Sequence, residues 1–265
     1  MTSTTNDRIY LLFRLVHSCC YALAACLLVA SLSSQATAKE TTEIGWTLRQ
    51  TSLMRGDQEL IACKYGVKMT PLRGGETYLF VPPYTQVQVW SMRTGKRCTI
   101  EMKDFRSQFQ TAKNLFDAQR LEAVPLKKVR EGMLNCLSTV EYSETPAFQQ
   151  RQVQLFTKRE APSRSAKSVC YIVSNKFNLA PNIYRCVSTF YGFPYKEAMP
   201  LSLVYYDMDH DRKTQLATGK ITPSKFSQQQ FAMPTGLKVV ANEQKVAEAA
   251  DYNEAIKMML PGKDK

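Results

Sequence analysis

Apolar and polar residues alternate along much of the first two thirds of the chain that follows residue 38. In the clearest run, residues 59–70, one side of the alternation carries Ile61, Cys63, Tyr65, Val67 and Met69. Successive side chains of a β-strand point to opposite faces, so this run predicts one strand with a covered face and a solvated face. Strands of this kind are typical of an antiparallel sheet that is covered on one side.

The same alternation recurs in shorter segments, at Tyr78 and Phe80, at Val87 and Val89, at Cys98, Ile100 and Met102, at Val153 and Leu155, and at Val169, Tyr171 and Val173. Short turn signals separate several of these segments, at 55–57, 73–75, 82–83 and 94–96. Consecutive strands joined by short turns form a meander, because antiparallel neighbours need only a tight connection. The pattern therefore predicts an antiparallel sheet of about nine to eleven strands.

Three segments instead have apolar residues at helical spacing: 104–117, 178–191 and 242–260. In the second, Asn178 is predicted to cap the helix, Pro181 falls in its first turn, and Gly192 is placed to end it. Asn242 is predicted to cap the third. The polar and basic segment 158–167 is expected to be a hairpin loop. The predicted class is α+β, with two to three helices against the sheet.

The N-terminus has the composition of a cleaved signal peptide over residues 1–38. It combines Arg8 and Arg14, an apolar run over 19–32, and a small-residue exit at Ala36-Thr37-Ala38. A basic N-terminal region and an apolar core are the features that export requires, and small residues at positions −3 and −1 are what signal peptidase requires for cleavage. Acylation at Cys26 is the alternative, but the mature chain would then begin with an apolar stretch, Leu27-Leu28-Val29, that has no evident role. We therefore expect a periplasmic or secreted protein whose single domain spans 39–265.

Charge narrows the choice of partners. The chain has a formal charge of +12, and removing 1–38, which carries Arg8 and Arg14 against Asp7, leaves +11. Such an excess favours acidic partners. For an exported protein, an anionic membrane surface or an envelope protein is a better candidate than nucleic acid, and we expect no nucleic-acid binding. Solubility alone explains the charge equally well.

Five cysteines follow residue 38: Cys63, Cys98, Cys136, Cys170 and Cys186. Their wide spacing contains no C-x-x-C pair and no zinc-binding pattern. An oxidising compartment allows one or two disulfides, and the odd number leaves at least one thiol free or intermolecular. The sequence does not give the pairing.

Catalytic and metal-binding chemistry have little support. His210 is the one histidine after residue 38, and it lies between two strand-like runs, where a solvated turn is expected. Asp207, Asp209 and Asp211 alternate as in the first half of a calcium loop, but Arg212 stands where that loop needs glycine and Thr218 where it needs glutamate. We expect neither an enzyme nor a metal site nor a cofactor.

The order of several motifs resembles the outer-membrane lipoprotein-carrier (LolA/LolB-like) superfamily, most closely its uncharacterised exported relatives. The motifs are Trp46-Thr47-Leu48, the hairpin-like segment Val129–Tyr142, Phe193-Pro194, Met199-Pro200-Leu201, and Phe231-x-x-Pro234-x-Gly236-Leu237-Lys238. The resemblance implies a curved antiparallel half-barrel that encloses helices, and a hollow that holds acyl chains. Some relatives serve instead as envelope-stress sensors.

The leading hypothesis is therefore a binding protein for a lipid, an acyl chain or another apolar ligand. The candidate ligand-binding residues alternate onto the covered face of the predicted sheet: Ile61, Tyr65, Val67, Met69, Tyr78, Phe80, Val87 and Val89. An ordinary filled core explains the same residues. The alternative function is a protein-interaction or stress-sensing module on the same fold, with the hollow filled by its own side chains.

Overall fold

The computed structural model describes residues 41–53, 55–106, 123–158 and 166–248. From Thr42 onward the chain forms one compact unit. Its strands are β1 (Thr42–Ser52), β2 (Gly56–Cys63), β3 (Gly66–Pro71), β4 (Thr77–Phe80), β5 (Gln86–Ser91), β6 (Lys96–Glu101), β7 (Leu126–Leu134), β8 (Leu137–Glu144), β9 (Ala166–Ser174), β10 (Met199–Asp207), β11 (Arg212–Ser227) and β12 (Lys238–Val239). The described helices are α4 (Pro146–Thr157), α5 (Pro181–Tyr191), the short 3₁₀ helix η2 (Gln228–Phe231) and α6 (Glu243–Ala247).

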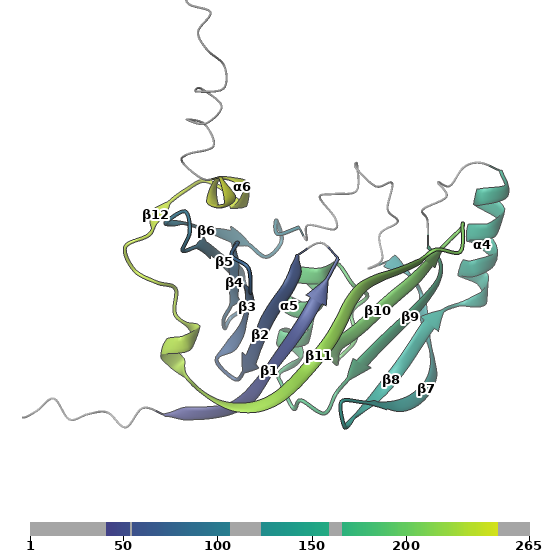
Figure 1. Ribbon diagram of the computed structural model, residues 1–265, viewed down its shortest axis with the longest axis horizontal. Coiled ribbons are helices and arrows are strands. Elements are labelled where there is room, and N and C mark those ends of the chain that lie inside the picture. The colour runs from purple at the N-terminus through teal and green to yellow at the C-terminus, as the bar shows by residue number, and fades with distance from the viewer. Residues whose placement is uncertain (1–40, 54, 107–122, 159–165, 249–265) are drawn as a thin grey trace, which may run out of the picture. The chain divides into compact units, whose positions relative to one another are not determined.

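All twelve described strands belong to one open sheet with the order β12-β6-β5-β4-β3-β2-β1-β11-β10-β9-β8-β7 (Figure 1). Every pair is antiparallel except the short β12, which runs parallel to β6. The central pair joins β1 to β11, so the first and the last long strand lie side by side. The predicted antiparallel meander is present on both sides of this pair. The described sheet has twelve strands, against the nine to eleven predicted.

The segment 59–70, predicted as one strand, is a hairpin, and that prediction is wrong. Cys63 pairs with Gly66, and Lys64 and Tyr65 form the turn between β2 and β3. Gly66 has a φ of 140°, a conformation that other residues rarely adopt. Because the chain reverses here, the alternation changes phase, and residues before and after the turn no longer share a face.

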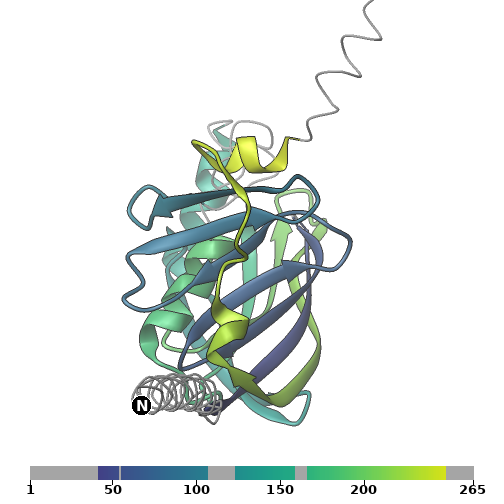
Figure 2. The same cartoon turned by 90° about the vertical axis from the view of Figure 1, so that its left-hand side faces the viewer.

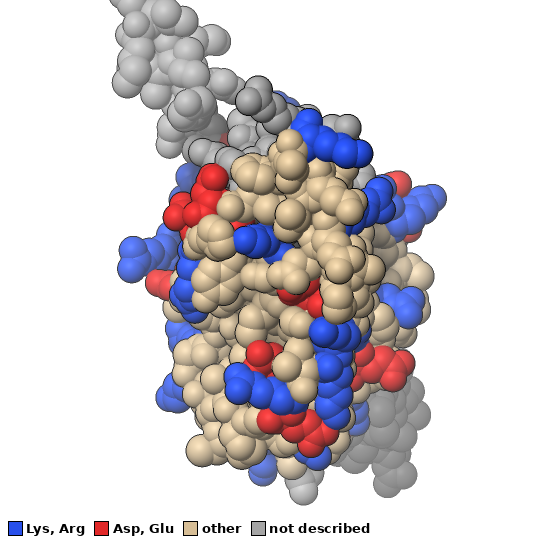
Figure 3. All heavy atoms as spheres, turned by 90° about the vertical axis from the view of Figure 1, so that its right-hand side faces the viewer, with Lys and Arg blue, Asp and Glu red and all other residues tan. Residues whose placement is uncertain are grey.

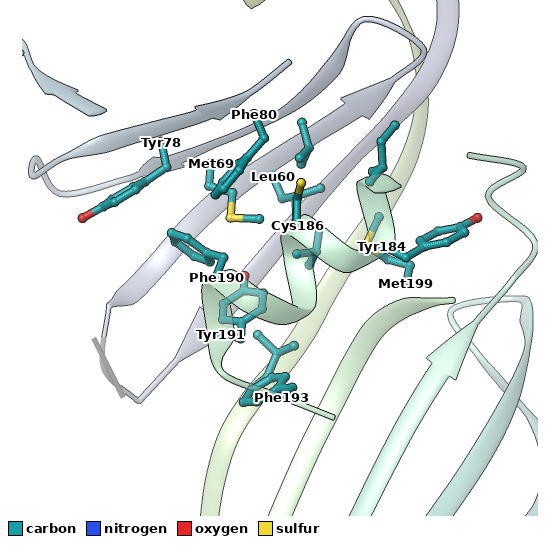
Figure 4. Packing of buried hydrophobic residues seen from close by; sticks show 14 of the residues in the cluster. Leu60, Met69, Tyr78, Phe80, Tyr184, Cys186, Phe190, Tyr191, Phe193 and Met199 are labelled. Carbon is teal, nitrogen blue, oxygen red and sulfur yellow. The ribbon is translucent and has the colours of Figure 1, made fainter. Parts of the chain in front are cut away.

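Helix α5 covers one face of the sheet and forms the main core with it. Pro181 occupies its first turn and Gly192 ends it with a φ of 70°, as predicted. The cap itself is Ala180, so the prediction that Asn178 caps this helix is wrong. Figure 4 shows Phe190 and Cys186 of α5 pointing toward Met69, Phe80 and other side chains from the strands.

A second apolar cluster lies on the opposite face of the sheet. It contains Ile61, Cys63, Leu79, Trp90, Phe226 and Phe231, and Tyr65, Val81, Met233 and Leu237 pack against it. Phe231, Met233 and Leu237 come from the segment that connects β11 to β12. That segment crosses the outer side of the strands in Figure 2. The sheet is therefore covered on both faces in this half, not on one face as the alternation predicted.

Helix α4 replaces a predicted strand. Val153 and Leu155 alternate, but they lie within the helix Pro146–Thr157. Pro146 occupies the first helical turn, where its missing N–H costs nothing, and the glutamine-rich sequence that follows favours helix. Two alternating residues were too few to outweigh these signals. No described helix has the length and apolarity needed to span a membrane.

Several predictions lie outside the described residues. They are the signal peptide over 1–38, the helix 104–117 from residue 107 onward, most of the loop 158–167, and the last helix after residue 248. Within the described part, Asn242 caps α6 as predicted, because its side chain accepts a hydrogen bond from the Lys245 N–H at 3.0 Å.

The five described cysteines are all free thiols, and only Cys136 is exposed. It lies with Asn135 in the two-residue turn between β7 and β8, and both have positive φ values. Burial raises the pKa of Cys98 to about 11 and that of Cys186 to about 12. Burial likewise raises the pKa of Cys63 and Cys170.

These environments predict selective thiol labelling. Cys63, Cys98 and Cys186 are buried, Cys170 is half-buried, and the pKa of each of these four thiols is raised, so exposed Cys136 is expected to react with a disulfide reagent at least about tenfold faster than the other four. The rate is measured from the chromophore released by native protein. Cys136→Ser should remove the fast phase and Cys170→Ser should leave it unchanged. A fast phase that survives Cys136→Ser would contradict the assignment.

Candidate functional site

The eight residues predicted to line a ligand hollow do not share one face. Six of them belong to the main core and are at most 1 % exposed: Val67, Met69, Tyr78, Phe80, Val87 and Val89. Ile61 belongs to the cluster on the opposite face, and Tyr65 packs against that cluster. The turn at Lys64 and Tyr65 explains this division, since it separates Ile61 and Tyr65 from the alternation of β3.

The six core residues are in contact with the protein's own side chains. The ring of Phe190 lies 5.0 Å from that of Tyr78 and 6.4 Å from that of Phe80, both edge-to-face. The Phe105 ring lies 5.8 Å from that of Phe80. Phe190 of α5, shown in Figure 4, and Phe105, which follows β6, thus occupy the place that an apolar ligand would take on this face.

At the edge of this core, Arg55 forms an unusual cluster. It lies in the turn between β1 and β2, where its backbone N–H donates to the Ser52 hydroxyl at 3.0 Å. Its guanidinium carbon is 4.2 Å from the ring centroid of Tyr78 and 4.2 Å from that of Phe190. The two centroids are 5.0 Å apart, so both rings lie toward the same side of the guanidinium. Contact with two aromatic rings favours its positive charge and restricts its movement.

Glu243, the first residue of α6, completes this cluster. Its carboxylate accepts a hydrogen bond from the Tyr78 hydroxyl. The Arg55 Nη2 is 3.8 Å from the same carboxylate oxygen, which is an ion-pair distance but too long for a hydrogen bond. Burial raises the pKa of Tyr78 far above its usual value, so the phenol stays protonated and donates.

The Arg55 guanidinium is therefore buried but incompletely paired. Its side chain is 9 % exposed, and its Nη2 has no hydrogen-bond partner among the described residues. A buried N–H without a partner costs about 1–3 kcal/mol, and more when the group is charged. Such a group is a natural receptor for an acceptor supplied from outside.

A polar network fixes the residues behind Arg55. The Tyr191 hydroxyl donates to Gln50 Oε1 at 2.7 Å and accepts from the Gln58 side-chain amide. Gln50 Nε2 donates to the Pro200 carbonyl at 3.0 Å and to the Thr218 hydroxyl at 2.9 Å. These contacts join β1, β2, α5, β10 and β11, so the floor of the site is rigid.

A cavity of about 180 Å³ adjoins Arg55. Met69, Pro71, Tyr78 and Phe190 supply apolar lining, Gly74 and Gly75 contribute backbone, and Gln58 and Glu76 add polar groups. Drug-sized ligands generally occupy pockets of about 300–1,000 Å³. The cavity is therefore of a size for one side chain or one small polar group.

A larger hollow of about 700 Å³ lies between the end of β6 and α6. Apolar lining comes from Ile100 and Phe105, and charged lining from Glu76, Glu101, Asp104, Arg106 and Glu243. Most of its lining surface is apolar, and four of its five charged residues are acidic. Its rim includes Arg106, the last described residue before the gap at 107–122.

The two polar motifs considered for chemistry form a turn. His210 and Asp211 lie between β10 and β11, and the Asp211 N–H donates to the buried Asp207 carboxylate at 2.8 Å. Lys213 Nζ is 2.9 Å from Asp211 and 3.7 Å from Asp207. The turn predicted at His210 is thus present, and its acidic residues pair with Lys213. Among the described residues, no group of His, Cys, Asp and Glu is arranged to hold a metal ion.

Sequence reasoning did not identify Arg55 as a functional candidate. Arg55-Gly56-Asp57 was interpreted only as a turn signal. The two rings that contact Arg55 come from β4 and α5, which are distant in the sequence. No local pattern encodes that contact.

No protein-family model matches the chain, and no curated protein matches it. Among solved structures, an uncharacterised conserved protein from Thermus thermophilus matches with a TM-score of 0.34 and 9 % identity, covering 77 % of this chain and 92 % of that one. MucB in complex with MucA matches with a TM-score of 0.34 and 10 % identity, covering 80 % of this chain and 61 % of that one. The Pseudomonas aeruginosa MucA/MucB complex gives a TM-score of 0.32, 10 % identity, and coverages of 80 % and 62 %. The chain thus spans about three fifths of the MucB-containing chains that it matches.

Proposed function

We propose that this protein is an exported, non-catalytic protein-binding module of the cell envelope. The observation that carries the proposal is the filling of the main core. The covered face, predicted as a ligand hollow, is occupied by Phe190, Phe105 and their neighbours, and the 180 Å³ cavity beside Arg55 is small and has both polar and apolar lining. A site of that size suits one side chain of a partner better than a hydrocarbon tail.

Export and cleavage near Ala38 are part of the proposal. Strand β1 begins at Thr42, so removal of residues 1–38 leaves the whole described sheet in the mature chain. The proposed fold is a LolA-like half-barrel in which the open sheet bends around α5. The motif order from Trp46 to Lys238 supports this finer assignment.

Lipid binding is the second candidate, and the 700 Å³ hollow beside β6 favours it. Its volume falls within the range of ligand pockets, and Ile100 and Phe105 supply apolar surface. The acidic residues on its walls disfavour an anionic head group.

Attraction to an anionic membrane surface has less support. Figure 3 shows Lys and Arg interspersed with Asp and Glu on the face that carries α4, β7 and β8. Four basic residues, Lys127, Lys128, Lys158 and Arg159, are the candidates for this role, and Lys128 is 2.6 Å from Glu131. Lys127 and Lys158 are exposed, and Arg159 lies outside the described residues. Surface charges of mixed sign produce no broad positive field.

The two functions predict different results for protein purified without detergent from the envelope fraction. Protein binding predicts a native mass equal to the chain mass, no lipid in an organic extract, and a crosslinked partner that rebinds when purified. Lipid binding predicts an extra mass and about one extractable lipid per chain. A stoichiometric lipid together with no rebinding partner would reject the proposal.

A further inference from the structure

We infer that the cavity beside Arg55 binds a carboxylate presented by a peptide, either an acidic side chain or a C-terminus. This inference rests on the proposed protein-binding function and names the chemistry that the partner supplies. The observations are the buried guanidinium in contact with two aromatic rings, its Nη2 without a hydrogen-bond partner, and the adjoining 180 Å³ cavity.

The orientation of Arg55 limits what it can bind. Tyr78 and Phe190 each lie 4.2 Å from the guanidinium carbon and occupy the same side of the group, and all its N–H bonds lie in its plane, so a ligand can accept hydrogen bonds only at the remaining free edge. A planar guanidinium edge matches a carboxylate, which accepts two parallel N–H bonds. Stacking also fixes the group before binding, and less side-chain entropy is lost when a ligand arrives.

Glu243 does not satisfy this edge. Its carboxylate oxygen is 3.8 Å from Arg55 Nη2 and accepts a hydrogen bond from Tyr78. A carboxylate entering the cavity can approach Nη2 to about 2.8 Å and form the hydrogen bond that Glu243 does not. Glu243 therefore weakens the site by repulsion without occupying it, and its removal should strengthen binding.

Glu76 explains why a peptide suits the site better than a free anion. This carboxylate also lines the cavity, and it has no ion pair or hydrogen bond among the described residues. A free anion would be repelled by Glu76 and Glu243 together. A peptide brings its own backbone N–H groups, which can donate to Glu76 while its carboxylate pairs with Arg55. The net charge of +11 on residues 39–265 also favours acidic segments over basic ones.

The test measures fluorescence polarisation of labelled peptides with the purified protein. One peptide carries internal glutamates and an amidated C-terminus, a second carries no acidic side chain but a free C-terminal carboxylate, and a third carries glutamine and an amide. Sodium acetate serves as the free anion. The first or the second peptide is expected to bind at least about tenfold more tightly than the third and than acetate.

Arg55→Gln should weaken that binding by about tenfold or more, and Arg55→Lys should weaken it by several fold because the planar edge is lost. Arg73→Gln is the matched control. Its side chain is 89 % exposed near the same loop, so the change in affinity should stay below about threefold. Arg55 also packs in the core, and a loss of binding by the Arg55 variants therefore needs a second readout.

Glu243→Gln supplies that readout, since it should tighten binding by about threefold or more, and misfolding does not strengthen a specific interaction. Equal binding of the three peptides, or affinities unchanged by both Arg55→Gln and Glu243→Gln, would overturn the inference. The proposed function fails separately, through the rebinding experiment with the crosslinked partner. A partner that rebinds the Arg55→Gln variant normally would keep the proposed function and reject the carboxylate site.

Discussion

Replacing Phe190 by alanine is expected to lower the free energy of unfolding by about 3–5 kcal/mol. Phe190 is 1 % exposed and lies at the centre of the main core. Its ring is 5.0 Å from those of Tyr78 and Tyr191, so the substitution removes aromatic pairs worth about 0.5–1.5 kcal/mol each in addition to buried area. It also removes one of the two rings that contact the Arg55 guanidinium.

Denaturant unfolding followed by tryptophan fluorescence measures this loss. The comparison requires that the unfolding free energy of the wild type and of Phe190→Ala depend on denaturant concentration with the same slope. Phe156→Ala is the matched control. Phe156 lies on α4 and is 38 % exposed, so the same chemical change should cost less than about 1 kcal/mol. Similar losses at the two positions would mean that Phe190 is not a central core residue. The Phe190 variant should also expose the Arg55 edge to water and weaken acidic-peptide binding.

Helix α5 shows what the sequence could predict well. Apolar residues at helical spacing, Pro181 in the first turn and Gly192 at the end are all local signals, and each acts within a few residues. The antiparallel character of the sheet was predictable for the same reason, since short turns between alternating segments leave few other topologies. These features depend on near neighbours, and sequence patterns encode near neighbours.

The β2–β3 turn shows where local reasoning failed. Lys64 and Tyr65 are not typical turn residues, and the alternation of apolar residues continues through them. Gly66 was the available signal, because glycine inside a strand pattern often marks a turn, a bulge or a close approach of backbones. Missing it placed Ile61 and Tyr65 on the wrong face of the sheet.

Long-range contacts account for the rest of what was missed. The segment that crosses the outer face lies after β11, yet it covers residues of β2, β4 and β5. Arg55 likewise obtains its environment from Tyr78, Phe190 and Glu243, which belong to three different elements. Such contacts form only after the strands are ordered in space, so a candidate site built from them is visible only in the structure.

Replacing Gly66 by alanine is expected to destabilise the protein by about 3 kcal/mol or more, since two costs combine at this position. A φ of 140° strains any residue with a Cβ, and that Cβ would overlap the carbonyl oxygen of Phe80 on β4.

Two control variants separate the backbone strain from the steric overlap. Gly74→Ala has a φ of 84° but no atom within 4 Å, so it should show the backbone strain alone, about 1 kcal/mol or somewhat more. Gly132→Ala has neither cost, since its nearest contact is the Thr139 hydroxyl at 3.6 Å, and its stability should change by less than about 1 kcal/mol. The denaturant midpoints of the three variants measure the order of their stabilities. If Gly66→Ala is no less stable than Gly74→Ala, then β3 and β4 do not approach as closely as the structure describes.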